Sequence, residues 1–247
     1  MSFAAIVASL HGGSGKTLLA RVLAEYFILS GRRPLLFDTD TADCRLCACF
    51  PHDTLVIDLA HVPDQMTLFD TLAVASPEAR VVDVSHQCFR KFFRVMHDID
   101  FVAETRAPSV DLAIFYVGDR NADSYEEALH LRERFGDCAF VAVDNAFTAQ
   151  PGERIRRGDA YQVFVTHDLR MTIPILEPGS MVALADAEFS LSAFMREPVS
   201  LGEATLAPAS PAVDARAALR AWLMRMFRQI HRVSRAATMR AEPVSAK

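Results

Sequence analysis

Short apolar segments alternate with amphipathic segments along most of the chain, and this alternation limits the folds that are open to it. Each apolar segment is rich in small or β-branched residues and ends at a polar residue or glycine, which is typical of a buried strand. We predict strands at Phe3–Ser9, Arg33–Phe37, Leu55–Leu59, Arg80–Val84, Asp111–Val117, Cys138–Asp144 and Thr172–Leu176. Strands that alternate with helices favour a doubly wound, mostly parallel α/β sheet with helices on both faces.

The segments between these strands have apolar residues at three- and four-residue spacings, as amphipathic helices do. We predict one helix from Thr17 to about Gly31 and others at Gln65–Ala75, Cys88–Ala103 and Ser124–Phe135. A length of 247 residues suits a single domain of this class. We expect that domain to span residues 1–202, with a linker at 203–212 and a C-terminal basic helix and tail at 213–247.

Composition indicates an ordinary folded protein, with 51% hydrophobic and 23% charged residues. No window has the run of about 18 apolar residues that a membrane-spanning helix needs. Five cysteines, an odd number, do not suggest a disulfide framework, so we expect thiols in a reducing compartment. These observations favour a cytoplasmic protein.

A glycine-rich stretch lies between the first strand and the first helix, and it reads Leu10-His11-Gly12-Gly13-Ser14-Gly15-Lys16-Thr17. Glycines admit positive φ angles and let backbone N–H groups point at phosphate oxygens, while the start of the helix adds partial positive charge. Lys16, one of only three lysines, would contact the β- and γ-phosphates, and the Thr17 hydroxyl would ligate Mg²⁺. The stretch therefore predicts a site for ATP with Mg²⁺.

This loop resembles that of the deviant Walker A ATPases, the group that includes partition and Min-type division-site ATPases. The family loop reads K-G-G-x-G-K-[ST], so His11 stands in place of the signature lysine, and the nucleotide-binding positions correspond to Gly12, Gly13, Ser14, Gly15, Lys16, Thr17 and Leu18. The resemblance implies a nucleotide-dependent homodimer in which residue 11 reaches the partner's phosphates. A histidine supplies less positive charge than a lysine, so we expect slow hydrolysis.

Acidic residues at the ends of other strands would complete this site. Asp38 and Asp40 look like the family's D-x-D segment, which implies that Asp38 positions the attacking water and that Asp40 senses the nucleotide and supports the metal. Asp83 and Asp58 are competing candidates for the outer magnesium ligand, and we favour Asp83 because its strand signal is longer. The alternative for Asp38 and Asp40 is an Asp-rich turn that caps a helix.

Two further positions resemble residues that hold the base in this family. Asn145, just past the sixth strand, would read adenine through its paired donor and acceptor. Pro174 belongs to a segment that looks like the loop flanking the base. Asn145 is equally consistent with an ordinary turn residue.

Three cysteines follow the acidic turn in a C-x-x-C-x-C pattern, at Cys44, Cys47 and Cys49. Thiolates at this spacing can bind zinc or an iron–sulfur cluster, although no fourth ligand is evident. We favour free thiols packed near the nucleotide site.

The C-terminal segment places apolar residues on one face of a helix and arginines on the rest, with Leu219, Trp222, Leu223, Met226, Phe227, Ile230 and Val233 on the apolar face. Such a helix at residues 216–235 could lie in an anionic membrane surface, as in some Min-type proteins, which would place the protein peripherally on the inner face of the cytoplasmic membrane. It could equally dock onto its own domain. Non-specific DNA binding is a third, less favoured option.

The function that these residues favour is an ATP-binding, slowly hydrolysing switch that acts in partition or in spatial positioning of a protein cargo. One rival is a small-molecule kinase or other metabolic P-loop enzyme, for which Arg154–Arg157 would be the basic lid. The other is a non-hydrolysing nucleotide-binding scaffold, which His11 favours.

Overall fold

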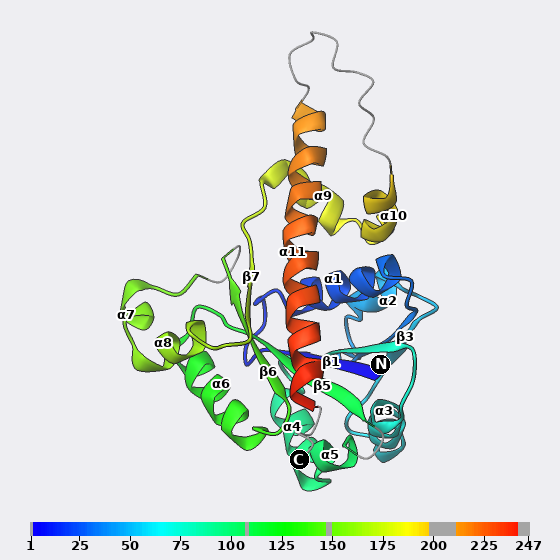
Figure 1. The fold of residues 1–247 in the computed structure, drawn as a ribbon, viewed down its shortest axis with the longest axis vertical. Coiled ribbons are helices and arrows are strands. Elements are labelled where there is room, and N and C mark those ends of the chain that lie inside the picture. Colours follow the sequence, from blue (N-terminus) through cyan, green and yellow to red (C-terminus); the bar gives the residue numbers. More distant parts are fainter. Residues whose placement is uncertain (1, 107–108, 147–149, 198–210, 242–247) are drawn as a thin grey trace, which may run out of the picture.

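The computed structural model describes residues 2–106, 109–146, 150–197 and 211–241. Its centre is a seven-stranded sheet in the order β3-β2-β4-β1-β5-β6-β7, in which every neighbouring pair is parallel (Figure 1). The strands are β1 (Ser2–Ala8), β2 (Pro34–Asp38), β3 (Thr54–Val56), β4 (Ala79–Asp83), β5 (Val110–Val117), β6 (Ala139–Asn145) and β7 (Arg170–Ile173).

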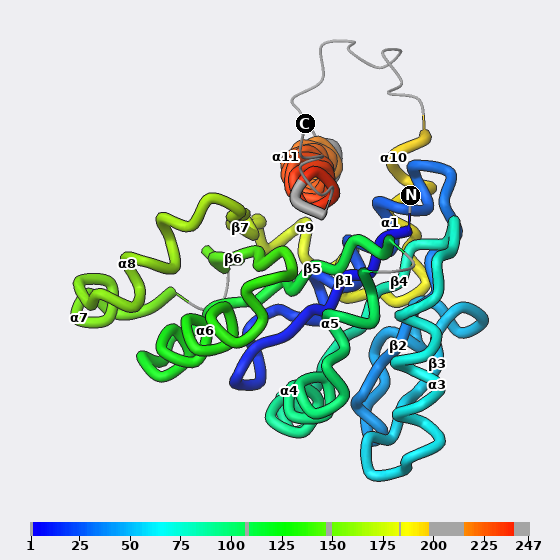
Figure 2. Tube along the Cα trace, turned by 60° about the horizontal axis from the view of Figure 1, so that its bottom comes forward, coloured from blue at the N-terminus to red at the C-terminus, as the bar shows by residue number. Residues whose placement is uncertain are grey.

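Helices cover both faces of this sheet. The described helices are α1 (Lys16–Leu29), α2 (Arg45–Cys49), α3 (Val62–Ala73), α4 (Phe89–Asp98), α5 (Phe101–Glu104), α6 (Ala122–Arg134), α7 (Glu153–Arg156), α8 (Asp159–Val165), α9 (Pro178–Ala185), α10 (Leu191–Arg196) and α11 (Pro211–Ala241). Helices α1, α10 and α11 pack on one face, and α3, α4, α6 and α8 pack on the other (Figure 2). The doubly wound α/β fold expected from the sequence is confirmed, and the sheet is parallel throughout.

Strand β1 lies at the middle of the sheet and is buried along its whole length. Its side chains alternate between two hydrophobic clusters, because successive residues of a strand point to opposite faces. Phe3, Ala5 and Val7 face α1 and α11, whereas Ala4, Ile6 and Ala8 face the opposite helices. An uninterrupted apolar run is what a strand covered on both faces requires.

Three boundaries differ from the sequence expectation for local reasons. Strand β3 ends at Val56 rather than Leu59, because Asp58 turns the chain by accepting a hydrogen bond from the Ala60 N–H. Strand β7 ends before Pro174, which has no N–H to donate. The single helix expected at residues 88–103 is broken into α4 and α5 at Asp100, whose φ is 46°.

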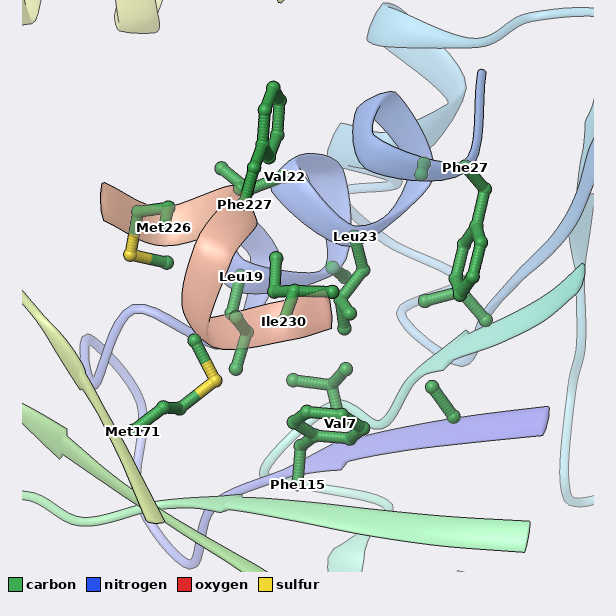
Figure 3. Close-up of a cluster of buried hydrophobic side chains, with 14 of the residues drawn as sticks. Val7, Leu19, Val22, Leu23, Phe27, Phe115, Met171, Met226, Phe227 and Ile230 are labelled. Carbon is green, nitrogen blue, oxygen red and sulfur yellow. The ribbon is translucent and has the colours of Figure 1, made fainter. Parts of the chain in front are cut away.

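The C-terminal helix α11 docks onto the domain instead of presenting an apolar face to its surroundings. Figure 3 shows Met226, Phe227 and Ile230 of α11 packed beside Leu19, Val22 and Leu23 of α1, above the sheet residues Val7, Phe115 and Met171. The seven apolar residues singled out on this helix are all buried. The apolar face is therefore occupied by the protein's own core, as in the docking alternative, and binding of residues 216–235 to a membrane stays a prediction.

Helix α11 also covers the exposed edge of the sheet. The Trp222 indole N–H donates to the Pro174 carbonyl over 2.8 Å, and the Gln229 side chain accepts from the Thr172 N–H and donates to the Thr172 carbonyl. Arg232 donates to the Arg170 carbonyl. Because an edge strand has unpaired backbone groups, these side chains take the place of a further strand beside β7.

The expected division at residues 203–212 stays a prediction, because residues 203–210 lie outside the described ranges and Pro211 already belongs to α11. Within the described ranges, no helix is both long enough and apolar enough to cross a membrane.

The cysteines depart from the sequence expectation. Cys44 and Cys47 form a disulfide, so the expectation of thiols is wrong for this pair, whereas Cys49, Cys88 and Cys138 are free. Among the described residues, no group of three or more His, Cys, Asp or Glu side chains is arranged to hold a metal ion, so the C-x-x-C-x-C cluster finds no support as a metal site.

The packing of α11 yields a stability prediction. Trp222→Ala should lower the free energy of unfolding by about 3–5 kcal/mol, because it leaves a cavity between α11 and β7 and removes the hydrogen bond to Pro174. Arg228→Ala, at an exposed position of the same helix, should change it by less than about 0.5 kcal/mol. Urea unfolding of both variants measures this; a loss below about 1 kcal/mol for Trp222→Ala would show that α11 is not part of the core.

Candidate functional site

The glycine-rich loop leaves the carboxyl end of β1 and leads directly into α1. Gly13 and Gly15 have φ angles of 73° and 95°, in the left-handed region that favours glycine. A Cβ at Gly15 would lie 2.5 Å from the Asn145 side-chain nitrogen, so a larger residue cannot fit there without displacing Asn145. Gly13 faces open space. The loop thus has the positive-φ backbone that turns N–H groups toward an anion.

Lys16 lies at the base of this loop and is buried. Burial lowers the pKa of its ammonium group, and the carboxylates of Asp83, Asp40, Asp119 and Asp38 counteract that effect by attraction. These four carboxylates come from the carboxyl ends of β2, β4 and β5, and β1, which leads into the loop, lies between β4 and β5. The arrangement gathers acidic groups around one cation, at the edge where ligands bind in open α/β sheets.

The geometry favours Asp83 over Asp58 as the partner of Thr17. Asp83 pairs in register with Val7, close to the start of the loop, and its carboxylate accepts a hydrogen bond from the Thr17 hydroxyl. Burial raises the pKa of Asp83, while Thr17 and Lys16 lower it. Asp58 instead follows the edge strand β3. Its carboxylate accepts a hydrogen bond from the Ala60 N–H, and its own backbone N–H donates to the Asp64 carboxylate.

Asp38 and Asp40 stand at the carboxyl end of β2, next to β4. Asp38 is 2% exposed and accepts hydrogen bonds from the backbone N–H groups of Asp40 and Leu46. Burial, with the nearby carboxylates of Asp83 and Asp40, raises the pKa of Asp38 to about 7 against the lowering effect of those two N–H groups. Asp38 therefore changes its charge near neutral pH. Asp40 accepts from Ala42 and Asp43, so the Asp-rich turn considered from the sequence is also present.

The His11 side chain points toward two carboxylates of its own chain. Its Nδ1 lies 2.9 Å from a carboxylate oxygen of Asp119, and its Nε2 lies 3.5 Å from a carboxylate oxygen of Asp123. The reach toward a partner's phosphates, implied by the family resemblance, is therefore not made in this conformation. Both carboxylates belong to the segment after β5, so His11 ties the glycine-rich loop to that segment.

The two residues expected to hold the base are in different situations. Asn145 is buried, and its amide donates to the Ser14 carbonyl over 2.6 Å, so it supports the glycine-rich loop. Pro174 lies just past β7, with its carbonyl bound by Trp222. A contact of either residue with adenine stays a prediction. Leu18 is half-buried near the start of α1.

Sequence reasoning missed several residues of this site. Asp119 is 3% exposed and follows β5 by two positions, so its place after a predicted strand was an available signal. The His86 ring would lie 3.3 Å from a Cβ at Gly12. The Thr39 hydroxyl accepts from the Ser85 N–H, and the Ser85 hydroxyl lies 3.4 Å from a carboxylate oxygen of Asp40. No sequence pattern pairs those two turns.

Buried polar atoms without hydrogen-bond partners make these residues fit a magnesium-bound nucleotide. Among the described residues, the buried Asp83 Oδ1 and Ser14 Oγ have no hydrogen-bond partner. Buried polar atoms without partners are uncommon in folded proteins and mark places where a ligand or ion can bind. Carboxylate and hydroxyl oxygens are the ligands that Mg²⁺ prefers. Thr17, Asp83 and Asp40 would hold the metal, and residues 12–17 the phosphates.

Similarity to known proteins is found among solved structures, at low identity. No family model matches the chain, and no curated protein matches it. Among solved structures it is similar to the cell division ATPase MinD of Pyrococcus furiosus, with 13% identity over 94% of this chain and 100% of that chain and a TM-score of 0.48. A chain of the MinC:MinD cell division complex of Aquifex aeolicus has 14% identity, covers 100% and 98%, and has a TM-score of 0.47.

A third similar structure is a nucleotide-binding protein of Archaeoglobus fulgidus in complex with ADP. It has 13% identity over 80% of this chain and 89% of that chain, with a TM-score of 0.46. At these identities and TM-scores the similarity carries no conclusion about this site. The chemistry of the site therefore has to follow from this chain's own residues.

The raised pKa of Asp38 predicts how stability depends on pH. Its value is 3.8 when unperturbed and about 7 in the folded protein, so the folded state binds an extra proton between these values. The free energy of unfolding without nucleotide should therefore fall as pH rises from about 4 to 7. Because one pKa unit is worth about 1.4 kcal/mol, the contribution of Asp38 is at most about 4 kcal/mol.

Urea unfolding between about pH 5 and pH 8 measures this dependence. Asp38→Asn should have a shallower decline than the wild type, since it removes one titrating group. Asp43→Asn, at an exposed position of the same turn, is the matched control. Equal slopes for wild type and Asp38→Asn would contradict the assignment.

Proposed function

We propose that this protein is an ATP-binding switch that hydrolyses ATP slowly and acts in partition or spatial positioning. The glycine-rich loop would bind the phosphates, Mg²⁺ would be held by Thr17 with Asp83 and Asp40, and Asp38 would orient the water for hydrolysis. The bound metal would supply neutralisation of phosphate charge. ATP binding would favour a homodimer or a protein partner, and hydrolysis would reset the switch.

The observation that carries this proposal is the convergence on Lys16. A buried ammonium group faces four carboxylates from three strand ends, directly under a loop with two positive-φ glycines. A buried group of such charges is costly to maintain in a protein that binds nothing, because each charge loses hydration. Bound phosphates would supply negative charge beside Lys16. Mg²⁺ would supply positive charge beside the carboxylates.

Asp38 is suited to the role proposed for it. Its pKa of about 7 keeps a substantial fraction of the carboxyl ionised at neutral pH, and the N–H groups of Asp40 and Leu46 fix its orientation. An ionised carboxylate in this position can accept a hydrogen bond from a water molecule and take up its proton. The buried Asp83 lies in register with Asp38 on the neighbouring strand β4.

A non-hydrolysing scaffold is the second candidate, and the position of His11 favours it. The imidazole is engaged with Asp119 and Asp123, so this loop offers one cation, Lys16, where the family loop offers two lysines. Electrostatic stabilisation of developing phosphate charge is usually a large part of catalysis. The kinase alternative gains less support, because Arg157 of its proposed lid pairs with Glu153 on α7.

Lys16→Ala should weaken ATP binding in the presence of Mg²⁺ by about 10- to 100-fold, since it removes a charge-assisted contact worth about 1.5–3 kcal/mol. Isothermal titration calorimetry measures the affinity, and a thermal melt confirms that the variant is folded. Lys91→Ala, an exposed lysine on α4, is the matched control and should bind like the wild type. Equal affinity of Lys16→Ala and wild type would refute the proposal.

Asp38→Asn should retain ATP binding within about threefold but lower single-turnover hydrolysis by about 100-fold or more, because it removes the proton acceptor. Wild-type turnover should also rise as pH increases through about 7, where Asp38 ionises. Quenched-flow or manual quench assays with excess protein measure this step. Wild type that binds ATP without any turnover would instead favour the scaffold.

A further inference from the structure

A disulfide spans the start of α2, within a few residues of the proposed site. Cys44 and Cys47 are joined, with Cys44 as the residue that caps α2, and both side chains are partly accessible to solvent. The three remaining cysteines, Cys49, Cys88 and Cys138, are thiols. None of the roles proposed above uses this disulfide.

The disulfide and the two carboxylates belong to one hydrogen-bonded unit. The Leu46 N–H, which lies between the two bonded cysteines, points to Asp38 over 3.4 Å. The Asp40 carboxylate accepts from Ala42 and Asp43, immediately before Cys44, and the Cys47 N–H donates to the Cys44 sulfur over 3.2 Å. The covalent bond therefore joins Cys44, the residue that follows the Asp40 turn, to the first turn of α2.

One side of this turn is anchored and the other is not. Leu46 is fully buried in the core, and the Thr54 hydroxyl contacts the Leu46 carbonyl. By contrast, residues 41–43 are exposed, and the N–H groups of Ala42 and Asp43 donate to the Asp40 carboxylate within the same turn. Cleavage of the disulfide would free the Cys44 side of the turn while Leu46 stays in place.

We propose that Cys44 and Cys47 form a reversible dithiol–disulfide exchange site and that its redox state sets the order of the turn that carries Asp40. The co-reactant is a dithiol, either small or part of a protein. One of its thiolates attacks a sulfur of the Cys44–Cys47 bond to give a mixed disulfide, and its second thiolate then displaces the protein sulfur. Two electrons and two protons pass from the dithiol, which becomes a disulfide, to Cys44 and Cys47.

This site goes beyond the proposed nucleotide switch. Its effect on nucleotide affinity rests on that proposal. The thiol–disulfide exchange and the ordering of the turn do not depend on it. The closed turn would hold Asp40 for Mg²⁺, so the disulfide form is the form competent for the metal-bound nucleotide. Partial exposure of both cysteines gives a dithiol access to the bond.

The experiment equilibrates the full chain in mixtures of reduced and oxidised dithiothreitol, with alkylation and peptide mass analysis to report each cysteine. Cys44 and Cys47 should convert together between the two forms, while Cys49 stays alkylated throughout. Backbone amides of residues 40–47 should exchange hydrogen at least about tenfold faster in the reduced form. The double variant Cys44→Ser with Cys47→Ser should exchange fast under both conditions, and Cys49→Ser should behave like the wild type.

Two results would overturn the proposal: a pair that stays alkylated at every mixture, or amide exchange in residues 40–47 that is the same in both forms. ATP binding with Mg²⁺ in the same samples should weaken by at least about fivefold on reduction, as the turn loses order. Equal affinity in both forms would overturn the coupling to the nucleotide. Absence of binding in both forms would count against the proposed function, whereas the alkylation and exchange data would still decide the redox site.

Discussion

Burial of β1 on both faces is the constraint on which the rest of the structure depends. A central strand needs neighbours on both edges to satisfy its backbone groups, and these are β4 and β5. Because all the strands are parallel, their carboxyl ends lie along one edge of the sheet. The glycine-rich loop after β1 therefore meets Asp83 at the end of β4 and Asp119 after β5, and Asp38 lies one strand further away. The position of the site follows from the position of the core.

The same constraint makes this edge electrostatically costly. Asp38 and Asp83 are buried beside each other, so desolvation raises the pKa of both, and Lys16 only partly offsets their charge. Helix α1, which begins at this edge, is held in place by hydrogen bonds further along its length. Arg21 donates to the carbonyls of residues 184, 186 and 189, and Glu25 accepts from Leu191 and Ser192. These contacts fix α1 from the side away from the loop. A firmly held helix can support a strained, charged terminus.

Much of this arrangement could be predicted from local pattern. Apolar runs identified the strands, and their order identified the edge where Lys16, Asp38 and Asp83 meet. What local pattern could not supply was the partner of each group. The period of residues 216–235 predicts a helix with one apolar face, but the period is the same whether that face meets α1 or a lipid surface. Likewise, His11 and Asp119 are 108 residues apart in sequence, and a C-x-x-C spacing is equally compatible with thiols, a metal site or a disulfide.

The docking of α11 bears directly on whether it could ever bind a membrane. Lipid would also bury its apolar side chains, so the transfer free energy of those side chains nearly cancels between the two states. The cost of exposing the apolar surface of α1 and β7 that α11 now covers does not cancel. Undocking would also break the bonds from Trp222 to Pro174 and from Gln229 to Thr172, which satisfy the edge strand. Because Pro174 belongs to the segment expected to flank the base, release of α11 would disturb the proposed nucleotide site from the side opposite Asp38, and a membrane-bound form would have to differ there from the docked one.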